Sequence, residues 1–285
     1  MAQPPLKWAG GKRWLVNRHR WLFPETVESL IEPFLGSGAV FFALQPAKAL
    51  LSDKNADLIQ FYRVLKEKPL AIQELMKAHQ ARHSKEHYYR VRSYSPLDEI
   101  ERAARFLYLN RSCFNGIYRV NRNGYFNVPK GTKERVYFEE ENFELYSLIL
   151  KSASLCVCGF GDSIKKSKEG DFLFVDPPYT VKHNNNGFVK YNEILFAWKD
   201  QVQLKHDLLR AAERGVKILM TNAYHESILD LYEDIGVLHE LGRESVIGGG
   251  NQYRSLTSEC VIQIGYSTQP HSAELPHLST EDLRI

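Results

Sequence analysis

The sequence has 285 residues, of which 44% are hydrophobic and 25% charged, which is typical of a globular protein with a sizeable core in one or two domains. The formal net charge of +3 is too small to define a partner by itself. The N-terminal stretch MAQPPLKWAGGK lacks the apolar run of a signal peptide, and no segment is long and apolar enough to span a bilayer. We therefore expect a cytoplasmic protein with no membrane partner.

The four cysteines, Cys113, Cys156, Cys158 and Cys260, form no CxxC pair and no cluster with histidine at the spacing of metal ligands. None of them follows a proline, so the Pro-Cys nucleophile of pyrimidine C5 methylation is missing. We expect four reduced thiols and no metal cofactor.

Apolar runs alternate with helical patterns toward both ends of the chain. Strands are predicted over 28–34, 48–53, 154–160, 171–176, 216–222 and 258–266, and helices over 39–45, 56–69 and 199–215. The helix over 56–69, for example, has apolar residues at Leu58, Ile59, Tyr62 and Leu65, which is helical spacing. Such alternation favours an α/β fold with a mostly parallel sheet.

The middle of the chain has a different pattern. It is helical from Pro69 to about Ser112, and it is then rich in Asn, Gly and aromatic residues over 113–133. Segment 111–133 contains no acid and the basic residues Arg111, Arg119, Arg122, Lys130 and Lys133. We predict an inserted second domain over 57–145, between the two parts of the sheet domain, 1–56 and 146–266. The tail over 267–285 has few apolar residues and two prolines, so we expect it to be flexible.

A glycine turn, EPFLGSG, follows the first predicted strand and opens the next helix. Gly36 and Gly38 would let the backbone approach a ligand, and Ser37 can cap the helix. A plain turn between strand and helix explains these residues equally well. Asp53 ends the second strand, where an acid commonly takes the ribose hydroxyls of a nucleoside. The alternative for Asp53 is an N-cap of the helix that follows.

The stretch FLFVDPPYT places an acid, two prolines and an aromatic residue at the end of another apolar strand. Because parallel strands end at one edge of a sheet, Asp176 should point into the same crevice as Gly36 and Asp53. The prolines lack N–H donors but keep their carbonyls as acceptors. Adenine N6 fits this arrangement, because the Asp176 carboxylate and the Pro177 carbonyl can accept its two N–H groups while its ring stacks on Tyr179. A strand-ending turn is the alternative.

A base that reacts at N6 must leave the stack if its substrate is a duplex. Tyr179 would then replace the lost stacking, which is worth roughly 1–3 kcal/mol. The basic segment 111–133 would neutralise phosphates, and its Asn and Arg side chains can pair with adenine and guanine in the major groove. Taken alone, a basic run of this kind is more typical of a solvated surface loop.

Together these motifs resemble those of the Dam-like DNA adenine-N6 methyltransferases, which use S-adenosylmethionine. The segments that carry the similarity are LKWAGGKRWL (6–15), IEPFLGSGAVFF (31–42), LSDKNADLI (51–59), FLYLNRSCFNGIYRVNRNGYFNVPKG (106–131) and FVDPPY (174–179). The resemblance implies a Rossmann-like S-adenosylmethionine-dependent methyltransferase sheet over 1–56 and 146–266, with an inserted, mainly helical DNA-recognition domain over 57–145.

The resemblance also implies roles for individual residues. Asp176, Pro177, Tyr179 and Lys12 would act in catalysis. The cofactor would bind to Trp8, Lys12, Phe34, Gly36, Gly38, Asp53, Phe160 and Asp176. Double-stranded DNA would contact Lys7, Phe114, Asn115, Ile117, Arg119 and Pro129. No residue is assigned to a metal.

The reaction that the resemblance implies is direct, in-line transfer of a methyl group from the sulfonium to N6 of a flipped adenine in duplex DNA, with no covalent enzyme intermediate. GATC is the target that it suggests, and we expect a monomer, with a cognate restriction nuclease as a further partner. The loop TVKHNNNGFVKY (180–191) and the turn IGGGNQ (247–252) depart from the family's pattern. An RNA adenine-N6 methyltransferase with the same core and a catalytically dead DNA-binding relative are the alternatives.

Overall fold

The computed structural model describes residues 3–121, 123–181, 196–244 and 256–268 of the chain. Arg122, most of the 180–191 loop, the 247–252 turn and nearly all of the 267–285 tail lie outside the described residues, and so do the expectations that concern them. Among the helices that the structure describes, none is long and apolar enough to cross a membrane.

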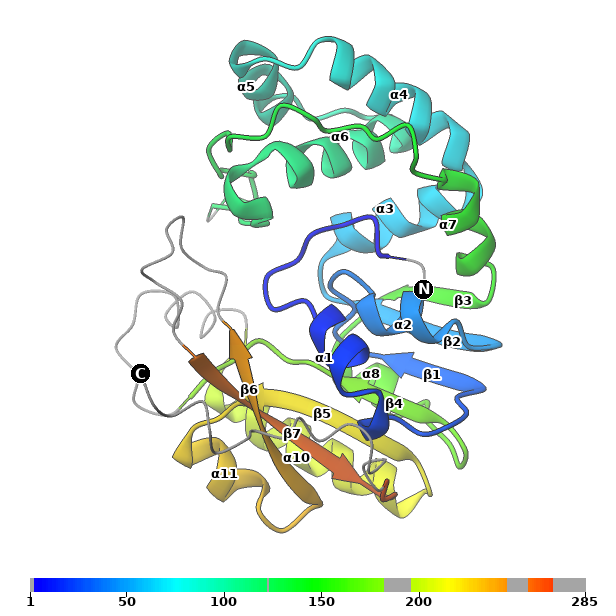
Figure 1. Cartoon of the computed structure of the whole chain (residues 1–285), viewed down its shortest axis with the longest axis vertical. Coiled ribbons are helices and arrows are strands. Elements are labelled where there is room, and N and C mark those ends of the chain that lie inside the picture. The colour runs from blue at the N-terminus through cyan, green and yellow to red at the C-terminus, as the bar shows by residue number, and fades with distance from the viewer. Residues whose placement is uncertain (1–2, 122, 182–195, 245–255, 269–285) are drawn as a thin grey trace, which may run out of the picture.

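The described strands form one mixed sheet in the order β3-β2-β1-β4-β5-β7-β6 (Figure 1). In chain order the strands are β1 (Ser29–Glu32), β2 (Lys48–Asp53), β3 (Ala153–Val157), β4 (Phe172–Val175), β5 (Lys217–Ala223), β6 (Val237–Glu244) and β7 (Leu256–Ile264). The pairings from β3 to β5 are all parallel, whereas β7 runs antiparallel to both β5 and β6. The predicted α/β fold with a mostly parallel sheet is confirmed, and β6 is a strand that the sequence patterns did not predict.

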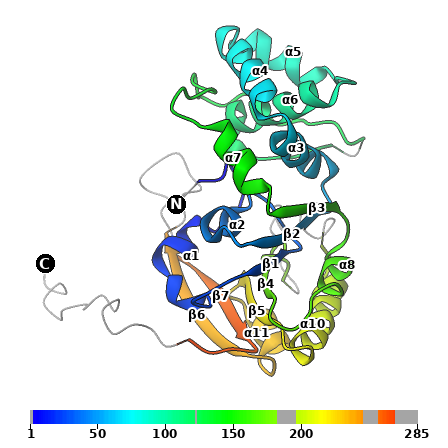
Figure 2. The same ribbon diagram turned by 90° about the vertical axis from the view of Figure 1, so that its right-hand side faces the viewer.

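Helices cover both faces of the sheet, as Figure 2 shows from the side. One face carries α1 (Arg13–Arg18) and α2 (Ala39–Leu44), and the other carries α8 (Phe160–Ile164), α10 (Trp198–Glu213) and α11 (Glu226–Tyr232). Burial on both sides explains why all four residues of β4 are apolar and buried. The predicted glycine stop of α10 is confirmed, because Gly215 has a φ of +80° just after the helix ends.

The remaining helices are α3 (Ala56–Glu67), α4 (Pro69–Ala81), α5 (Lys85–Ser93), α6 (Glu99–Ser112) and α7 (Phe143–Leu150), with short 3₁₀ turns at Arg20–Leu22 and Phe114–Gly116. Helix α3 buries the predicted apolar residues on one side and begins at Asn55, whose side chain accepts a hydrogen bond from the Leu58 N–H. Helices α4 to α6 stack beyond α3, away from the sheet (Figure 1).

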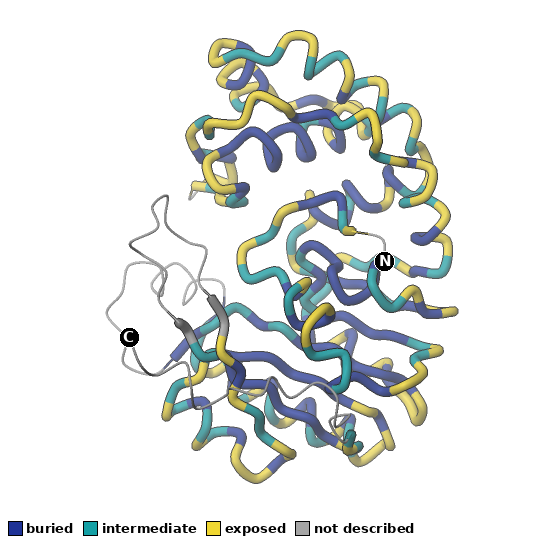
Figure 3. The backbone as a smooth tube through the Cα atoms, viewed as in Figure 1, coloured by how far each residue is buried: buried dark blue, intermediate teal, exposed yellow. Residues whose placement is uncertain are grey.

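The helical region and the sheet share one apolar core. Figure 3 shows buried stretches of backbone in both the sheet and the helical region. A single buried cluster runs from Phe174 and Val261 on the sheet through Phe41 to Phe106 and Leu107 on α6. The opposite face of the sheet has its own cluster under α8, α10 and α11. Helices α3 and α7, which contain residues 57 and 145, pack against each other and join the two regions.

Residues 113–121 and 123–131 form the two arms of a hairpin that begins at the C-terminal end of α6. Its two arms are held by antiparallel bridges between Cys113 and Lys130 and between Val120 and Phe126. At the tip, the Asn121 side chain accepts hydrogen bonds from the backbone N–H groups of Asn123 and Tyr125. The hairpin therefore presents a short, internally bonded two-stranded arm next to the sheet region.

Candidate active site

The sheet changes winding direction between β1 and β4, because β2 and β3 lie on one side of β1 and β5 lies beyond β4. In open α/β sheets ligands bind at such a switch point, outside the carboxyl ends of the strands. The Gly36 turn follows β1, Asp53 ends β2 and Asp176 follows β4. The structure therefore brings the three sequence motifs together at one sheet edge, as parallel strands require.

Gly36 and Gly38 both have left-handed backbone conformations, with φ of +49° and +66°. A Cβ on Gly36 would lie only 2.9 Å from Cδ1 of Trp8, so the indole packs directly against this turn. The expected cap of the following helix by Ser37 is wrong, because Gly38 is the N-cap and no side chain caps α2. Ser37 is buried instead, and its carbonyl accepts a hydrogen bond from Tyr62.

Asp53 accepts hydrogen bonds from two backbone segments, the glycine turn after β1 and the start of α3. One carboxylate oxygen accepts from the Gly36 N–H at 3.3 Å and the other from the Asn55 N–H at 2.9 Å. The N-cap reading of Asp53 is wrong, because Asn55 caps α3. Burial raises the pKa of the Asp53 carboxyl, and the backbone N–H groups around it act in the opposite direction. A carboxylate with two bound donors still has lone pairs for a further hydroxyl.

An aromatic wall lies beside this turn. Phe34 stacks on Phe160 with ring centroids 5.5 Å apart, and Phe196 contacts both rings at 5.6 Å. Phe34 comes from the loop after β1, and Phe160 is the first residue of α8. Two of the predicted cofactor residues are therefore in contact with each other, near the carboxyl ends of β1 and β3.

Asp176 sits in a network of buried charges. Its Oδ1 atom lies 2.9 Å from Nζ of Lys12 and accepts a 2.7 Å hydrogen bond from the hydroxyl of Thr221 on β5. Lys12 immediately precedes α1 and is only 2% exposed, and its ammonium also donates to the Gly10 carbonyl at 2.7 Å. No hydrogen bond within the described part of the chain uses Oδ2 of Asp176, which leaves this oxygen as an acceptor.

A second carboxylate completes the network. Glu259 on β7 lies 3.5 Å from the Lys12 ammonium and accepts a 2.7 Å hydrogen bond from the Tyr179 hydroxyl. The Lys12 ammonium lies 5.0 Å from the centre of the Tyr179 ring. Sequence reasoning found Lys12, Asp176 and Tyr179 but missed Thr221 and Glu259. The sequence did contain a signal for these two residues, because each is a polar residue inside a predicted buried strand.

Burial dominates the electrostatics of this network. It raises the pKa of Asp176, and Glu259 raises that pKa further, while Lys12 and Thr221 lower it. Tyr179 also has a raised pKa because burial and two neighbouring carboxylates disfavour the phenolate. Glu32, at the end of β1, is completely buried, and burial raises its pKa to about 8 although the Phe41 N–H binds its carboxyl group. At neutral pH Glu32 is therefore protonated.

The N-terminal segment connects this site to the hairpin. The side chain of Asn110 on α6 accepts from the Lys7 N–H at 2.9 Å and donates to the Lys7 carbonyl at 2.8 Å. The next residue, Trp8, stacks on Tyr118 in the hairpin with centroids 5.7 Å apart. Tyr118 in turn donates to Asp57 in the first turn of α3. One side of Trp8 therefore meets the Gly36 turn and the other meets the hairpin.

Most of the residues predicted to contact DNA are exposed on this hairpin or beside it. The exposed ones are Lys7, Phe114, Asn115, Arg119 and Pro129, while Ile117 is half-buried. Asn115 has a left-handed backbone with φ of +55°, and the Pro129 carbonyl accepts from the Phe114 N–H. Arg119 is held by the side chain of Asn127 at 2.9 Å. Lys7 and Trp8 therefore connect the hairpin and the helix before it to the active-site edge.

The basic segment is less available than its composition indicates. Arg111 is buried and forms a two-point ion pair with Glu141, and it also donates to the Pro5 and Val136 carbonyls. Its expected role as a phosphate ligand is wrong, because the guanidinium serves to join three segments of the chain. Lys130 pairs with Glu134 at 3.0 Å. Lys133 lies next to Lys7, and burial together with this neighbouring ammonium lowers the pKa of Lys133 to about 8.

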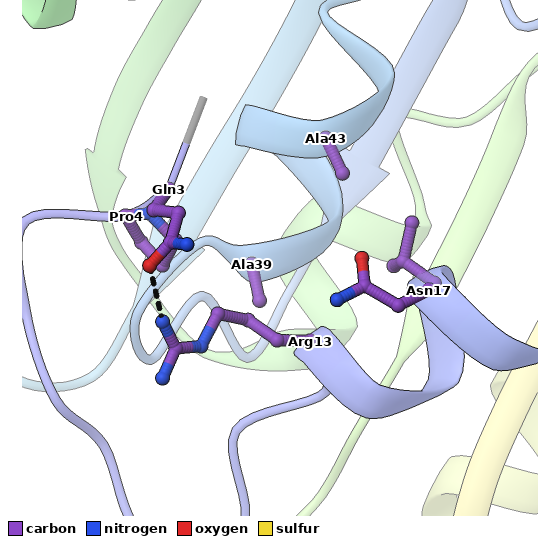
Figure 4. Close-up of a pocket in the computed structure, with 7 residues that line it drawn as sticks. Gln3, Pro4, Arg13, Asn17, Ala39 and Ala43 are labelled. Atoms are coloured by element: carbon purple, nitrogen blue, oxygen red, sulfur yellow. Dashed lines mark hydrogen bonds between the residues drawn. The ribbon is translucent and has the colours of Figure 1, made fainter. Parts of the chain in front are cut away.

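A separate pocket of about 180 Å³ lies between the N-terminal segment and helices α1 and α2 (Figure 4). It is lined by Gln3, Pro4, Arg13, Val16, Asn17, Ala39 and Ala43, and the Arg13 guanidinium spans it to bind Gln3. None of the predicted site residues lines it. Within the residues that the structure describes, no three His, Cys, Asp or Glu side chains are grouped so as to hold a metal ion.

The fold and this edge define a class: an α/β protein in which a glycine turn, an acid at the end of the second strand and a D-P-P-Y segment meet at the switch point of a mostly parallel sheet. A family model for the D12 class N6 adenine-specific DNA methyltransferases matches residues 8–246. The chain therefore belongs to this family, and the family prediction made from the sequence motifs is confirmed.

Individual relatives are similar over most of the chain. It is 35% identical over 269 residues to the type II methyltransferase M1.LlaDCHI of Lactococcus lactis subsp. cremoris, covering 91% of this chain and 94% of that protein. It is also 35% identical over 227 residues to the DNA adenine methylase of Vibrio cholerae, covering 76% and 80%. Identity reaches 40% over 237 residues with the DNA N-6-adenine-methyltransferase of Escherichia phage P1, of which the match spans 31%.

Proposed function

We propose that this protein transfers a methyl group from S-adenosylmethionine to N6 of an adenine that it flips out of duplex DNA. The observation that carries the proposal is the position of Asp176, which stands at the switch point of the sheet with Oδ1 bound by Lys12 and Thr221 and with Oδ2 directed to no described partner. A fixed carboxylate with one available oxygen is suited to accept an N–H group of an amine.

The residues of the site fit the cofactor. The Gly36 turn lets the backbone approach a ligand closely, Asp53 supplies a carboxylate for ribose hydroxyls, and Phe34 with Phe160 supplies aromatic surface for the adenine ring. Trp8 and Lys12 lie next to this turn on the side of Asp176. When bound, S-adenosylmethionine supplies an electrophilic methyl group on a sulfonium cation, which the surplus of carboxylates at this edge favours.

The protein groups would act on the target amine. Oδ2 of Asp176 and the Pro177 carbonyl would each accept one N6–H, so that the nitrogen lone pair points away from both. The cofactor would supply the methyl group and its sulfur would keep the electrons of the broken S–C bond, while N6, after gaining the N–C bond, would lose one proton that Asp176 would accept and pass to solvent. Tyr179 would hold the adenine by stacking, with its hydroxyl fixed on Glu259.

The hairpin surface would bind the target sequence. Lys7, Phe114, Asn115, Ile117, Arg119 and Pro129 would reach DNA from one surface, and we propose 57–145 as the recognition domain inserted between the catalytic parts 1–56 and 146–266. The relatives include type II methyltransferases, so a cognate restriction nuclease is a reasonable partner, and GATC is the first target to test. Such a protein acts where cellular DNA is, which for a bacterial host is the cytoplasm.

The experiment is incubation of the protein with duplex DNA and labelled S-adenosylmethionine, followed by nucleoside analysis and mapping of modified sites. N6-methyladenine at one short motif is the expected result. In the Asp176→Ala variant methylation should be lost while DNA binding stays measurable. An active Asp176→Ala variant would contradict the assignment of this residue.

Equal amounts of duplex DNA and structured RNA in one reaction test the substrate. Label in RNA alone would keep the chemistry and replace the substrate. Tight DNA binding without label in either nucleic acid would instead mean that the chain is a catalytically dead DNA-binding relative.

A further inference from the structure

We infer that Glu259 is a positioning residue of the methyl-transfer site, which orients Tyr179 and shares the ammonium of Lys12 with Asp176. The inference rests on the proposed function and adds a residue outside the stretch 8–246 that the family model matches. Glu259 lies on β7, near the C-terminal end of the described chain, and it is 4% exposed.

The strand register explains why a residue so far along the chain reaches this site. Strand β7 is antiparallel to β5, and Glu259 pairs with Ala223, so the start of β7 lies at the carboxyl end of β5. Side chains alternate along a strand, and Val261 belongs to the core cluster on the α1 side of the sheet. Glu259 therefore points to that same side, where Lys12 precedes α1.

Two carboxylates share one ammonium among the described residues. The ammonium of Lys12 lies 2.9 Å from Asp176 and 3.5 Å from Glu259, and it also donates to the Gly10 carbonyl. Lys12 therefore divides its attraction between two acids, and Glu259 weakens the share that falls on Asp176.

Negative charge on Asp176 is what the reaction needs. N6 becomes positively charged as the methyl group arrives and before its proton leaves, so a fixed carboxylate stabilises the developing charge. The second contact of Glu259 serves geometry. Its 2.7 Å hydrogen bond fixes the Tyr179 hydroxyl, and a phenol ring held at its far end keeps one orientation for stacking.

Two conservative changes separate charge from geometry. Glu259→Gln keeps an acceptor oxygen for Tyr179 but removes the charge, and Tyr179→Phe keeps the charge but removes the hydrogen bond. We expect Glu259→Gln to lower kcat roughly 10- to 100-fold, with little change in KM for DNA. We expect Tyr179→Phe mainly to weaken binding of the flipped base, seen as lower fluorescence of 2-aminopurine placed at the mapped target.

The pH profile of kcat tests the inference, because a residue with a merely structural role would leave this profile unchanged. The titratable groups that face Asp176 are Lys12 before α1, Glu32 on β1, Tyr179 after β4 and Glu259 on β7. Because the charge of Glu259 raises the pKa of Asp176, the acid limb of kcat should move to lower pH in Glu259→Gln. It should stay in place in Tyr179→Phe.

Gln263→Leu is the matched control for the strand. Gln263 lies on the same face of β7, is buried, and bonds to the Leu22 carbonyl and to His239 outside the site. This variant should melt at a lower temperature and keep its kcat below that temperature. A Glu259→Gln enzyme that loses kcat only in proportion to its unfolded fraction would overturn the inference, as would unchanged kcat with an unmoved acid limb.

If the Glu259→Gln variant does not fold, the Glu259→Asp variant is used to test the inference instead. This variant keeps the carboxylate charge on a side chain that is one methylene shorter. The acid limb of kcat should therefore stay near its original pH, while the 2-aminopurine signal should fall as in Tyr179→Phe. Wild-type 2-aminopurine signal and kcat in folded Glu259→Asp would overturn the positioning role. A wild-type protein that methylates no duplex DNA would instead refute the proposed function itself.

Discussion

The side chain of Asn110 binds both backbone groups of Lys7, accepting from its N–H at 2.9 Å and donating to its carbonyl at 2.8 Å. A carboxamide can do both at once, because it carries a donor and an acceptor side by side. This pair holds the start of the Trp8–Lys12 segment against the helix that leads into the hairpin. It thereby sets the distance between the surface proposed for DNA and the site proposed for chemistry.

Asn110→Leu should destabilise the protein and weaken DNA binding more than cofactor binding. The change removes two part-buried hydrogen bonds to the Lys7 backbone, each worth about 0.5–1.5 kcal/mol, which lowers the melting temperature by several degrees. Thermal unfolding and titrations with DNA and with S-adenosylmethionine measure the three effects. Asn17→Leu, an exposed asparagine on α1, is the control. Equal losses of both affinities would argue against a role in placing the hairpin.

Thr221→Val should lower kcat about tenfold or more and move the acid limb of activity to higher pH. The hydroxyl donates to Oδ1 of Asp176 and lowers the pKa of this carboxyl, so its loss raises that pKa further. Hydrogen bonds to charged groups are worth about 1.5–3 kcal/mol. Thr221→Ser keeps the hydroxyl and should retain the wild-type profile. A shift of the limb to lower pH in Thr221→Val would contradict the assignment of Asp176 as the ionising group.

Glu32→Gln should raise the melting temperature above pH 8. Burial raises the pKa of Glu32 from its ordinary value of 4.5 to about 8, so the folded state holds a proton that the unfolded state has lost between these values. The stability that this proton contributes is fully present below pH 4.5 and disappears as pH rises through 8. A glutamine stays neutral, and its oxygen can still accept from Phe41. Calorimetry from pH 5 to 9 should show that the melting temperature of the variant depends less on pH than that of the wild type. An equal dependence on pH would contradict the prediction.

Acid should weaken the helical region through its histidines. His79 stacks on Tyr108 and contacts His87 at 3.0 Å, and burial with neighbouring positive charge lowers the pKa of His79 to about 4. The unfolded chain binds a proton near pH 6.5, so the stability that neutral His79 contributes is present above pH 6.5 and is lost as pH falls toward 4.

His79→Phe keeps an aromatic ring on Tyr108 and cannot take up a proton. Its melting temperature should therefore decline less than that of the wild type between pH 6.5 and 4. Changing the exposed His206 to Asn should leave the wild-type decline in place. An equally steep decline in His79→Phe would assign the acid sensitivity to another group.

Much of the fold was predictable because its signals are local. Apolar runs located every strand from β1 to β5, and their shared carboxyl edge follows from parallel pairing, so the sequence alone was enough to place Gly36, Asp53 and Asp176 together. Helices α1, α7, α8 and α11 were missed, because none of them has more than eight residues and a short segment carries little periodicity. Strand β6 was missed because it mixes polar with apolar residues.

The rest depended on contacts between distant segments, which composition does not encode. In the sequence, Arg111 is one basic residue of an acid-free stretch. Its partner Glu141 lies outside that stretch, and the ion pair between them is buried and joins distant segments of the chain. Glu259 could not be assigned without the register of β7 against β5. Asn55, not Asp53, caps α3 because the Asp53 carboxylate is already committed to the Gly36 turn.

The position of Lys12 also has a consequence for the order in which the chain folds. Its ammonium is buried between Asp176 and Glu259, and the second of these lies on the last strand that the structure describes. During synthesis on the ribosome, Lys12 emerges first, Asp176 second and Glu259 last. The ammonium can pair with Asp176 before β7 exists, but its contact with Glu259 and the hydrogen bond that fixes the Tyr179 hydroxyl form only when β7 joins β5. The last of the described strands therefore completes the catalytic edge.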